Sequence, residues 1–147
     1  MLLTPHQSSL RKGRYSQANQ IYHIITNTKN RQPIFKNLKY ARIIIQNLMM
    51  QDEQQFTKTL AFVVMPDHIH WLLELKEAKT LSTIVKSVKA KTSQVVGKPI
   101  WQAGYYDHAI RIDEDIVNIA RYIIANPIRA GLVKRVGDYP HWHAIYL

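Results

Sequence analysis

Two apolar runs, residues 58–65 and 68–75, constrain this sequence most, because only Pro66 and Asp67 separate them. Proline presets its own backbone angle and aspartate favours turns, so the runs are predicted to be antiparallel strands joined by a tight hairpin. A chain of 147 residues is long enough to bury a sizeable core, and we expect one domain over 1–147.

Other segments carry equally local signals. β-branched and aromatic residues predict strands at 20–26 and 105–111, and apolar residues at helical spacing predict helices at 38–51, 80–96 and 116–126. The resulting order, β-α-β-β-α-β-α, matches a ferredoxin-like α+β sandwich, with one antiparallel sheet and helices on one face.

The composition narrows the class of protein. No repeat or linker divides the chain, so we expect one domain with a basic N-terminal arm at 1–19 and a short C-terminal tail at 134–147. No apolar run approaches the roughly 18 residues of a membrane span, and no membrane partner is expected. There are no cysteines, which excludes disulfides and thiolate ligands and fits a reducing cytoplasm.

Positive charge is strongly clustered within a net charge of +10. The segment 78–106 contains five lysines and no acidic residue, and the segment 1–51 is equally free of acids. The latter contains eight basic residues: Arg11, Lys12, Arg14, Lys29, Arg31, Lys36, Lys39 and Arg42. Such clusters favour a polyphosphate partner, because neutralised phosphates release counterions. The alternative is a solvated basic surface.

The predicted strand after the hairpin begins with His68, Ile69 and His70. Side chains alternate along a strand, so both imidazoles are expected on one face, about 7 Å apart, where they can bind one divalent cation. The alternative is two histidines on a half-exposed strand. A second pair, His141 and His143, lies in a proline-containing stretch without strong strand patterning, and we interpret it as part of the tail.

The helix at 116–126 carries a tyrosine outside its apolar stripe. Tyr122 shares a face with Asn118 and Asn126, at four residues on either side. The Asn126 amide oxygen is a hard ligand suited to Mg²⁺ or Mn²⁺. Two alternatives stay open: Tyr122 as a half-buried residue on the helix flank, and Asn126 as an N-cap before Pro127.

Together these segments resemble a known family. Residues 63–73 (VVMPDHIHWLL) resemble the His-hydrophobic-His (HUH) motif of single-tyrosine (IS200-like) transposases, and residues 121–133 (RYIIANPIRAGLV) resemble their nucleophile helix. Residues 101–108 (WQAGYYDH) and 21–24 (IYHI) are also similar to family segments. The basic N-terminal block and the Asn-Pro after the tyrosine look like the REP-associated tyrosine transposases, and the resemblance spans residues 11–140.

The resemblance implies a chemistry. His68 and His70 would bind the metal, Mg²⁺ or Mn²⁺, Tyr122 would be the nucleophile, and Asn126 the third ligand, where other branches use glutamine. The enzyme would cleave and rejoin single-stranded or hairpin DNA through a 5′-phosphotyrosine. The segment 139–143 departs from the common Tyr-Pro-Trp-Ser-Ser, which concerns C-terminal contacts rather than chemistry.

The expected DNA contacts are less specific. A basic groove with aromatic stacking platforms would suit single strands. The residues assigned to DNA binding are Arg11, Lys12, Arg14, Lys86, Lys89 and Arg121, and Tyr15, Trp101 or Tyr105 could stack on bases or belong to the core. The competing functions are a catalytically silent hairpin-binding protein, a metal-dependent nuclease that uses water, and an RNA-binding module. A monomer and a homodimer both stay open.

Overall fold

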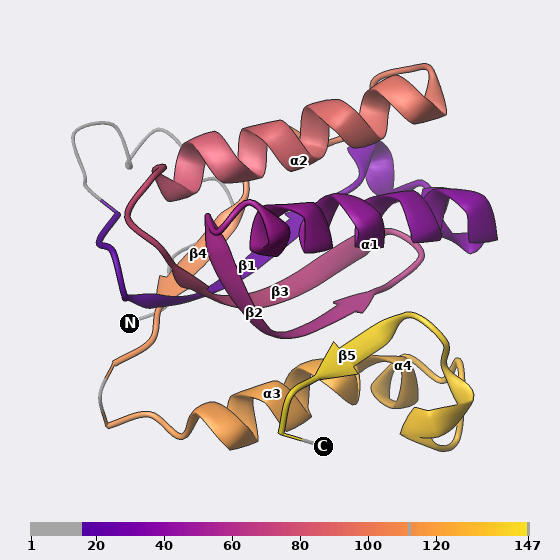
Figure 1. The fold of residues 1–147 in the computed structure, drawn as a ribbon. Coiled ribbons are helices and arrows are strands. Elements are labelled where there is room, and N and C mark those ends of the chain that lie inside the picture. Colours follow the sequence, from indigo (N-terminus) through magenta and orange to yellow (C-terminus); the bar gives the residue numbers. More distant parts are fainter. Residues whose placement is uncertain (1–15, 112, 147) are drawn as a thin grey trace.

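The computed structural model describes residues 16–111 and 113–146. They form a five-stranded antiparallel sheet in the order β4-β1-β3-β2-β5 (Figure 1). The strands are β1 (Ile21–Asn27), β2 (Thr57–Val64), β3 (His68–Leu75), β4 (Tyr106–Ala109) and β5 (Trp142–Ala144), and the α-helices are α1 (Leu38–Glu53), α2 (Leu81–Val96), α3 (Ile116–Ile124) and α4 (Asn126–Arg129). None of the helices in these ranges is long and apolar enough to cross a membrane.

Helices α1 and α2 cover one face of the sheet (Figure 1). Side chains of alternate residues, including Ile24 on β1 and Trp71 on β3, pack there against Ile44 of α1 and Ile84 of α2. The predicted stripe of α2 is buried as expected: Leu81, Ile84, Val85 and Val88. Thr80 caps the start of α2 and Gly97, with φ of 89°, ends it in the left-handed conformation that glycine adopts without strain.

Helix α3 lies against the opposite face (Figure 1). Its Ala120 and Ile123 pack on Val63 of β2 and Leu72 of β3 in a second apolar cluster. Since β3 side chains alternate, Leu72 shares this face with the two predicted metal ligands. The face that receives α3 is therefore the face of the histidine pair.

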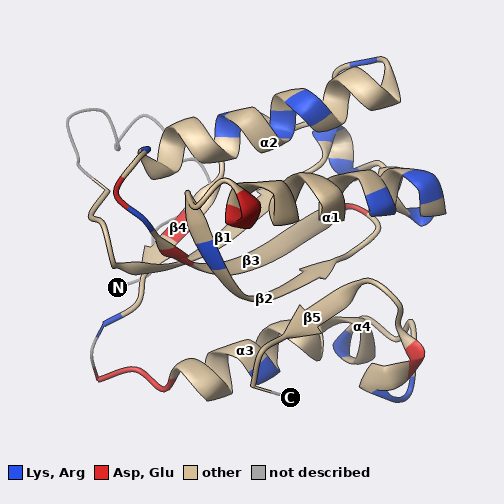
Figure 2. Cartoon of the chain, in the orientation of Figure 1, with Lys and Arg blue, Asp and Glu red and all other residues tan. Residues whose placement is uncertain are grey.

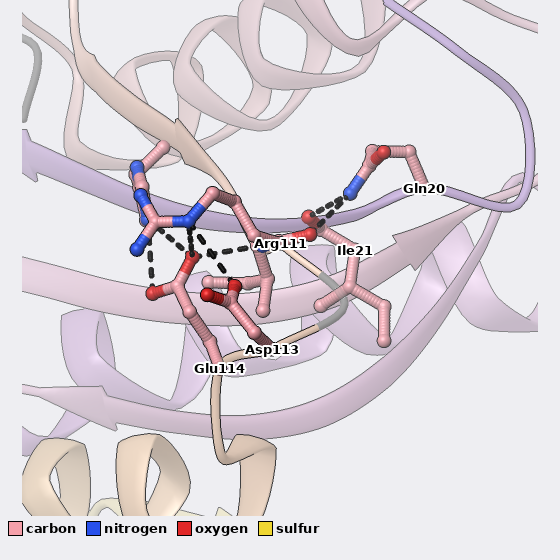
Figure 3. A network of polar contacts seen from close by, with 7 residues as sticks. Gln20, Ile21, Arg111, Asp113 and Glu114 are labelled. Carbon is pink, nitrogen blue, oxygen red and sulfur yellow. Dashed lines mark hydrogen bonds and ion pairs between the residues drawn. The ribbon is translucent and has the colours of Figure 1, made fainter. Parts of the chain in front are cut away.

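The connection from β4 to α3 is held by a polar network (Figure 3). Glu114 accepts a hydrogen bond from the Arg111 backbone N–H at 2.8 Å, and Arg111 Nε donates to Asp113 at 3.2 Å. Gln20 Nε2 donates to the carbonyls of Ile110 and Ile21 at 2.8 and 3.2 Å. These contacts lie between the edge strand β4 and the start of α3.

The predicted α+β fold is confirmed, with an antiparallel sheet whose order of elements is as expected through α3. Three features were not anticipated. The helix predicted to reach 126 ends at Ile124, and the tyrosine helix packs on the face that α1 and α2 leave open. The pair His141 and His143 was expected in a tail without a strand, but His143 lies on β5, which pairs with β2. This edge pairing is a long-range contact that local patterning does not reveal.

Candidate active site

His68 and His70 lie side by side on β3, directly after the hairpin turn. Their ring centroids are 5.1 Å apart and the planes are inclined at 70°. His70 is 8% exposed, and His68 is partly buried. The structure thus brings the predicted pair together on one face of the sheet, as strand alternation requires.

Each of these imidazoles is held through its Nδ1 atom. Nδ1 of His68 lies 2.7 Å from Oδ1 of Asp67, and the other carboxylate oxygen, Oδ2, accepts a hydrogen bond from Arg31 Nε at 3.0 Å. Nδ1 of His70 lies 2.9 Å from Nε2 of His23, on the neighbouring strand β1. Because both Nδ1 atoms are engaged, Nε2 is the nitrogen that each ring can offer to a cation.

The protonation states suit metal ligands. Burial, with smaller contributions from His23, His68 and the Arg129 charge, lowers the pKa of His70 to about 2. Burial also lowers the pKa of His68, although Asp67 opposes this shift. Both rings are therefore neutral at physiological pH, as metal binding requires.

The Asp67 carboxylate stays ionised beside them. Burial alone would raise its pKa, but hydrogen bonds and charge from His68 and Arg31 outweigh this and lower the pKa. Asp67 is therefore a proton acceptor toward the His68 Nδ1–H. The residue that shapes the hairpin turn also orients the first histidine.

Tyr122 projects from α3 into solvent. It is 60% exposed, in contrast to the neighbouring Ile123, which is fully buried. The Arg129 guanidinium carbon lies 3.7 Å from the centroid of the Tyr122 ring, and Arg129 Nη2 donates to the Tyr122 carbonyl at 2.6 Å. The alternative of a half-buried tyrosine is wrong, because the apolar side of α3 is supplied by the isoleucines.

Asn126 begins α4 after a break at Ala125, which occupies the N-cap position of that short helix. The Asn126 side chain therefore does not cap α4, as one alternative held. Its Nδ2 donates to the Ile123 carbonyl at 3.1 Å, so its amide oxygen is the atom suited to a cation. Within 16–111 and 113–146, no three His, Cys, Asp or Glu side chains are grouped to hold a metal.

Arg129 connects the tyrosine and the histidine pair. It stacks on Tyr122, and its positive charge is close enough to His70 to contribute to the lowered pKa of that ring. Arg129 therefore contacts the tyrosine directly and influences His70 through its charge.

Comparison with known proteins agrees with this arrangement. The sequence model described as "Transposase IS200 like" matches residues 16–126, from the first described residues to Asn126. The chain belongs to the IS200-like transposase family. It is 29% identical over 129 residues to a REP-associated tyrosine transposase of Escherichia coli K12, covering 86% of this chain and 78% of that protein.

Solved structures agree as well. A REP-associated tyrosine transposase bound to a REP hairpin superposes with a TM-score of 0.77 and 27% identity, covering 88% of this chain and 79% of that chain. A Deinococcus radiodurans protein, at 20% identity and a TM-score of 0.52, shares the fold over 74% of this chain and 92% of its own. The sequence-based identification of the family is therefore confirmed.

The residues predicted to bind DNA are spread over the molecule. Basic residues gather along α2 and at the start of α1 (Figure 2). Lys86 is exposed on α2, across the sheet from the histidines, whereas Lys89 Nζ donates to the carbonyls of Gln102 and Gly104. Arg121 is exposed beside Tyr122. Arg11, Lys12, Arg14 and Tyr15 lie outside the described residues.

The aromatic residues considered for stacking on bases are mainly structural. Tyr105 is buried, and Trp101 is partly buried with Nε1 donating to the Lys89 carbonyl at 3.0 Å. Sequence reasoning missed His23, Arg129 and Arg31 as neighbours of the site. The signal for His23 was present, because it lies between aromatic and β-branched residues in the predicted strand at 20–26.

Proposed function

We propose that this transposase cleaves and rejoins DNA strands at hairpins, using a divalent metal, Mg²⁺ or Mn²⁺, and Tyr122 as the nucleophile. The observation that carries the proposal is the pairing of two neutral imidazoles, both held through Nδ1, with an exposed tyrosine on the helix that covers the same sheet face. Arg129 contacts Tyr122, and its charge helps to lower the pKa of His70.

The donor set fits such a metal. His68 and His70 offer Nε2, and Asn126 offers a hard amide oxygen as a third ligand. Two imidazoles and one amide leave further positions for water and a phosphate oxygen. When bound, the metal would supply Lewis-acid stabilisation of negative charge on the scissile phosphate.

The proposed chemistry is a transesterification. The Tyr122 hydroxyl oxygen attacks the phosphorus and its proton passes to water, while the bond from phosphorus to the 3′ oxygen breaks. The products are a 5′-phosphotyrosine and a free 3′-hydroxyl, which takes up a proton. Reversal by another 3′-hydroxyl rejoins the strand without an energy cofactor, because the phosphotyrosine conserves the bond energy. Arg129 is placed to neutralise phosphate charge beside the ring.

Hairpin DNA is the substrate that we propose. The structural relative with a TM-score of 0.77 is bound to a REP hairpin. The present chain has a net charge of +10, with basic side chains such as Arg31 and Arg121 close to the proposed ligands and nucleophile. Such charge favours contact with phosphates on either side of the cleaved bond.

Covalent capture tests the proposal. Wild type and Tyr122→Phe are incubated with labelled single-stranded hairpins and Mg²⁺ or Mn²⁺, then separated on a denaturing gel. We expect a metal-dependent adduct with wild type and none with Tyr122→Phe. Tyr146→Phe is the matched control, because Tyr146 is a surface tyrosine near the end of the chain, and it should form the adduct normally.

Two outcomes would favour the other functions. Cleavage without an adduct that survives Tyr122→Phe would indicate a nuclease that uses water. Tight hairpin binding with neither cleavage nor an adduct would indicate a silent binding protein.

A further inference from the structure

His23 contacts the histidine pair although it belongs to a different strand. The register places Leu72 opposite His23 and Ile25 opposite His70, so the two histidines are diagonal neighbours on one sheet face. Their rings stack with centroids 5.2 Å apart and planes at 27°, and His23 Nε2 lies 2.9 Å from His70 Nδ1. The register between β1 and β3 therefore brings the two rings into contact.

We propose that His23 is a positioning residue that holds His70 in one tautomer and one ring orientation. A hydrogen bond between two imidazole nitrogens contains one proton, and a neutral imidazole carries only one N–H. If His70 donates from Nδ1 to Nε2 of His23, the lone pair of His70 is on Nε2, where a metal can bind it. This inference rests on the metal site of the proposed function.

The geometry does not allow His23 to bind the same metal through its Nε2 atom. Its Nε2 faces Nδ1 of His70 rather than the Nε2 that His70 would offer to the metal. His23 acts on the metal site through His70, just as Asp67 acts through His68. The two ligands are thus supported differently, one by a carboxylate and the other by a neutral imidazole.

The His23 ring is itself held in place. Tyr106 meets it edge-on, with centroids 6.3 Å apart. On the same edge strand His108 lies directly opposite His23, and its Nε2 is 3.0 Å from the carboxylate of Glu114, which also joins the network of Figure 3. Packing from β4 therefore restricts the rotation of His23 and, through it, of His70.

Nuclear magnetic resonance tests the tautomer directly. Long-range correlations between imidazole protons and ¹⁵N in the metal-free wild type report which nitrogen of His70 carries the proton. We expect the proton on Nδ1. A His70 ring protonated on Nε2 would overturn the inference, whatever the enzyme's activity.

Isothermal titration calorimetry with Mn²⁺ tests whether loss of His23 weakens metal binding. His23→Leu should weaken Mn²⁺ binding by roughly 10- to 100-fold, the range typical when a partner of a metal ligand is lost. His23→Gln, whose amide oxygen can accept the same hydrogen bond, should stay within about threefold of wild type. His143→Leu, at an exposed histidine of β5, is the control and should bind Mn²⁺ normally; melting temperatures establish that each variant is folded.

A failure of this inference can be distinguished from a failure of the proposed function. Equal Mn²⁺ affinity in wild type and folded His23→Leu would overturn the role of His23 and leave the proposed function standing. The metal site, and this inference with it, would be overturned by either of two results: wild type that does not bind Mn²⁺, or Mn²⁺ binding that persists in His68→Ala.

Discussion

The guanidinium of Arg129 lies over the exposed ring of Tyr122, with 3.7 Å between the guanidinium carbon and the ring centroid. Arg129 also donates to the Tyr122 carbonyl at 2.6 Å, so it binds both the side chain and the backbone of the proposed nucleophile. The contact spans the break between α3 and α4, because Tyr122 lies in α3 and Arg129 is the last residue of α4.

Arg129→Ala should therefore slow covalent attachment to DNA. The variant loses the group that orients the Tyr122 ring and a positive charge next to the phosphate, and we expect a roughly tenfold lower rate, about 1.4 kcal/mol in activation free energy. Thermal stability should change little, because an exposed cation–π contact contributes only about 0.5–1 kcal/mol. Arg135→Ala, which removes another surface arginine paired with Asp138, is the control in a single-turnover assay. Equal rates for the two variants would contradict a role of Arg129.

A mixing experiment should show that one chain supplies the whole active site. Arg129 contacts Tyr122, and its charge contributes to the lowered pKa of His70 in the same chain, so we predict an active site assembled in cis. A mixture of Tyr122→Phe and His70→Ala should therefore form no adduct with hairpin DNA. Wild type mixed with either variant serves as the positive control. An adduct from the two inactive variants would demonstrate a tyrosine acting on the partner's metal site.

The buried histidines should make stability depend on pH. Burial, and to a lesser extent His108, lowers the pKa of His23 from 6.5 to about 4, and that of His70 falls to about 2. Below pH 6.5 the unfolded chain binds protons at these rings that the folded chain does not. The free energy of unfolding therefore falls as the pH is lowered below 6.5.

Urea unfolding with EDTA between pH 7.5 and 5 measures this effect. Each ring should lower the free energy of unfolding by about 1.4 kcal/mol per pH unit once pH is well below 6.5. His23→Gln removes one ring, so its slope should be smaller by about that amount. Identical slopes for wild type and His23→Gln would show that His23 titrates normally in the folded protein.

The attachment of α3 to the sheet should depend on Ile123. This side chain is fully buried in the cluster between α3 and β2, so Ile123→Ala should lower the free energy of unfolding by about 2–5 kcal/mol. Ile128 offers a matched control five residues later, because it is 38% exposed and the same substitution should cost less than about 1 kcal/mol. Chemical denaturation of both variants provides the comparison, and similar losses would contradict the packing described for α3.

Much of the candidate active site could be predicted because its parts obey local rules. The alternation of a strand alone puts His68 and His70 on one face, and Pro66 with Asp67 is enough to predict the hairpin before them. Likewise, the helical periodicity of Ile116, Ile119 and Ile123 leaves Tyr122 outside the apolar stripe, which the structure confirms. Each of these relationships connects residues at most seven positions apart.

The sequence by itself therefore determined the elements, the face that carries the histidines and the exposure of Tyr122. The tertiary structure alone decided what meets there: His23 contacts His70 across 47 positions, α3 covers the face opposite α1 and α2, and β5 joins the edge of the sheet. The physical reason is that strand order and register follow from burying whole faces at once. The sequence of a single segment indicates which of its sides is apolar, but it does not indicate which distant side chain will cover that side.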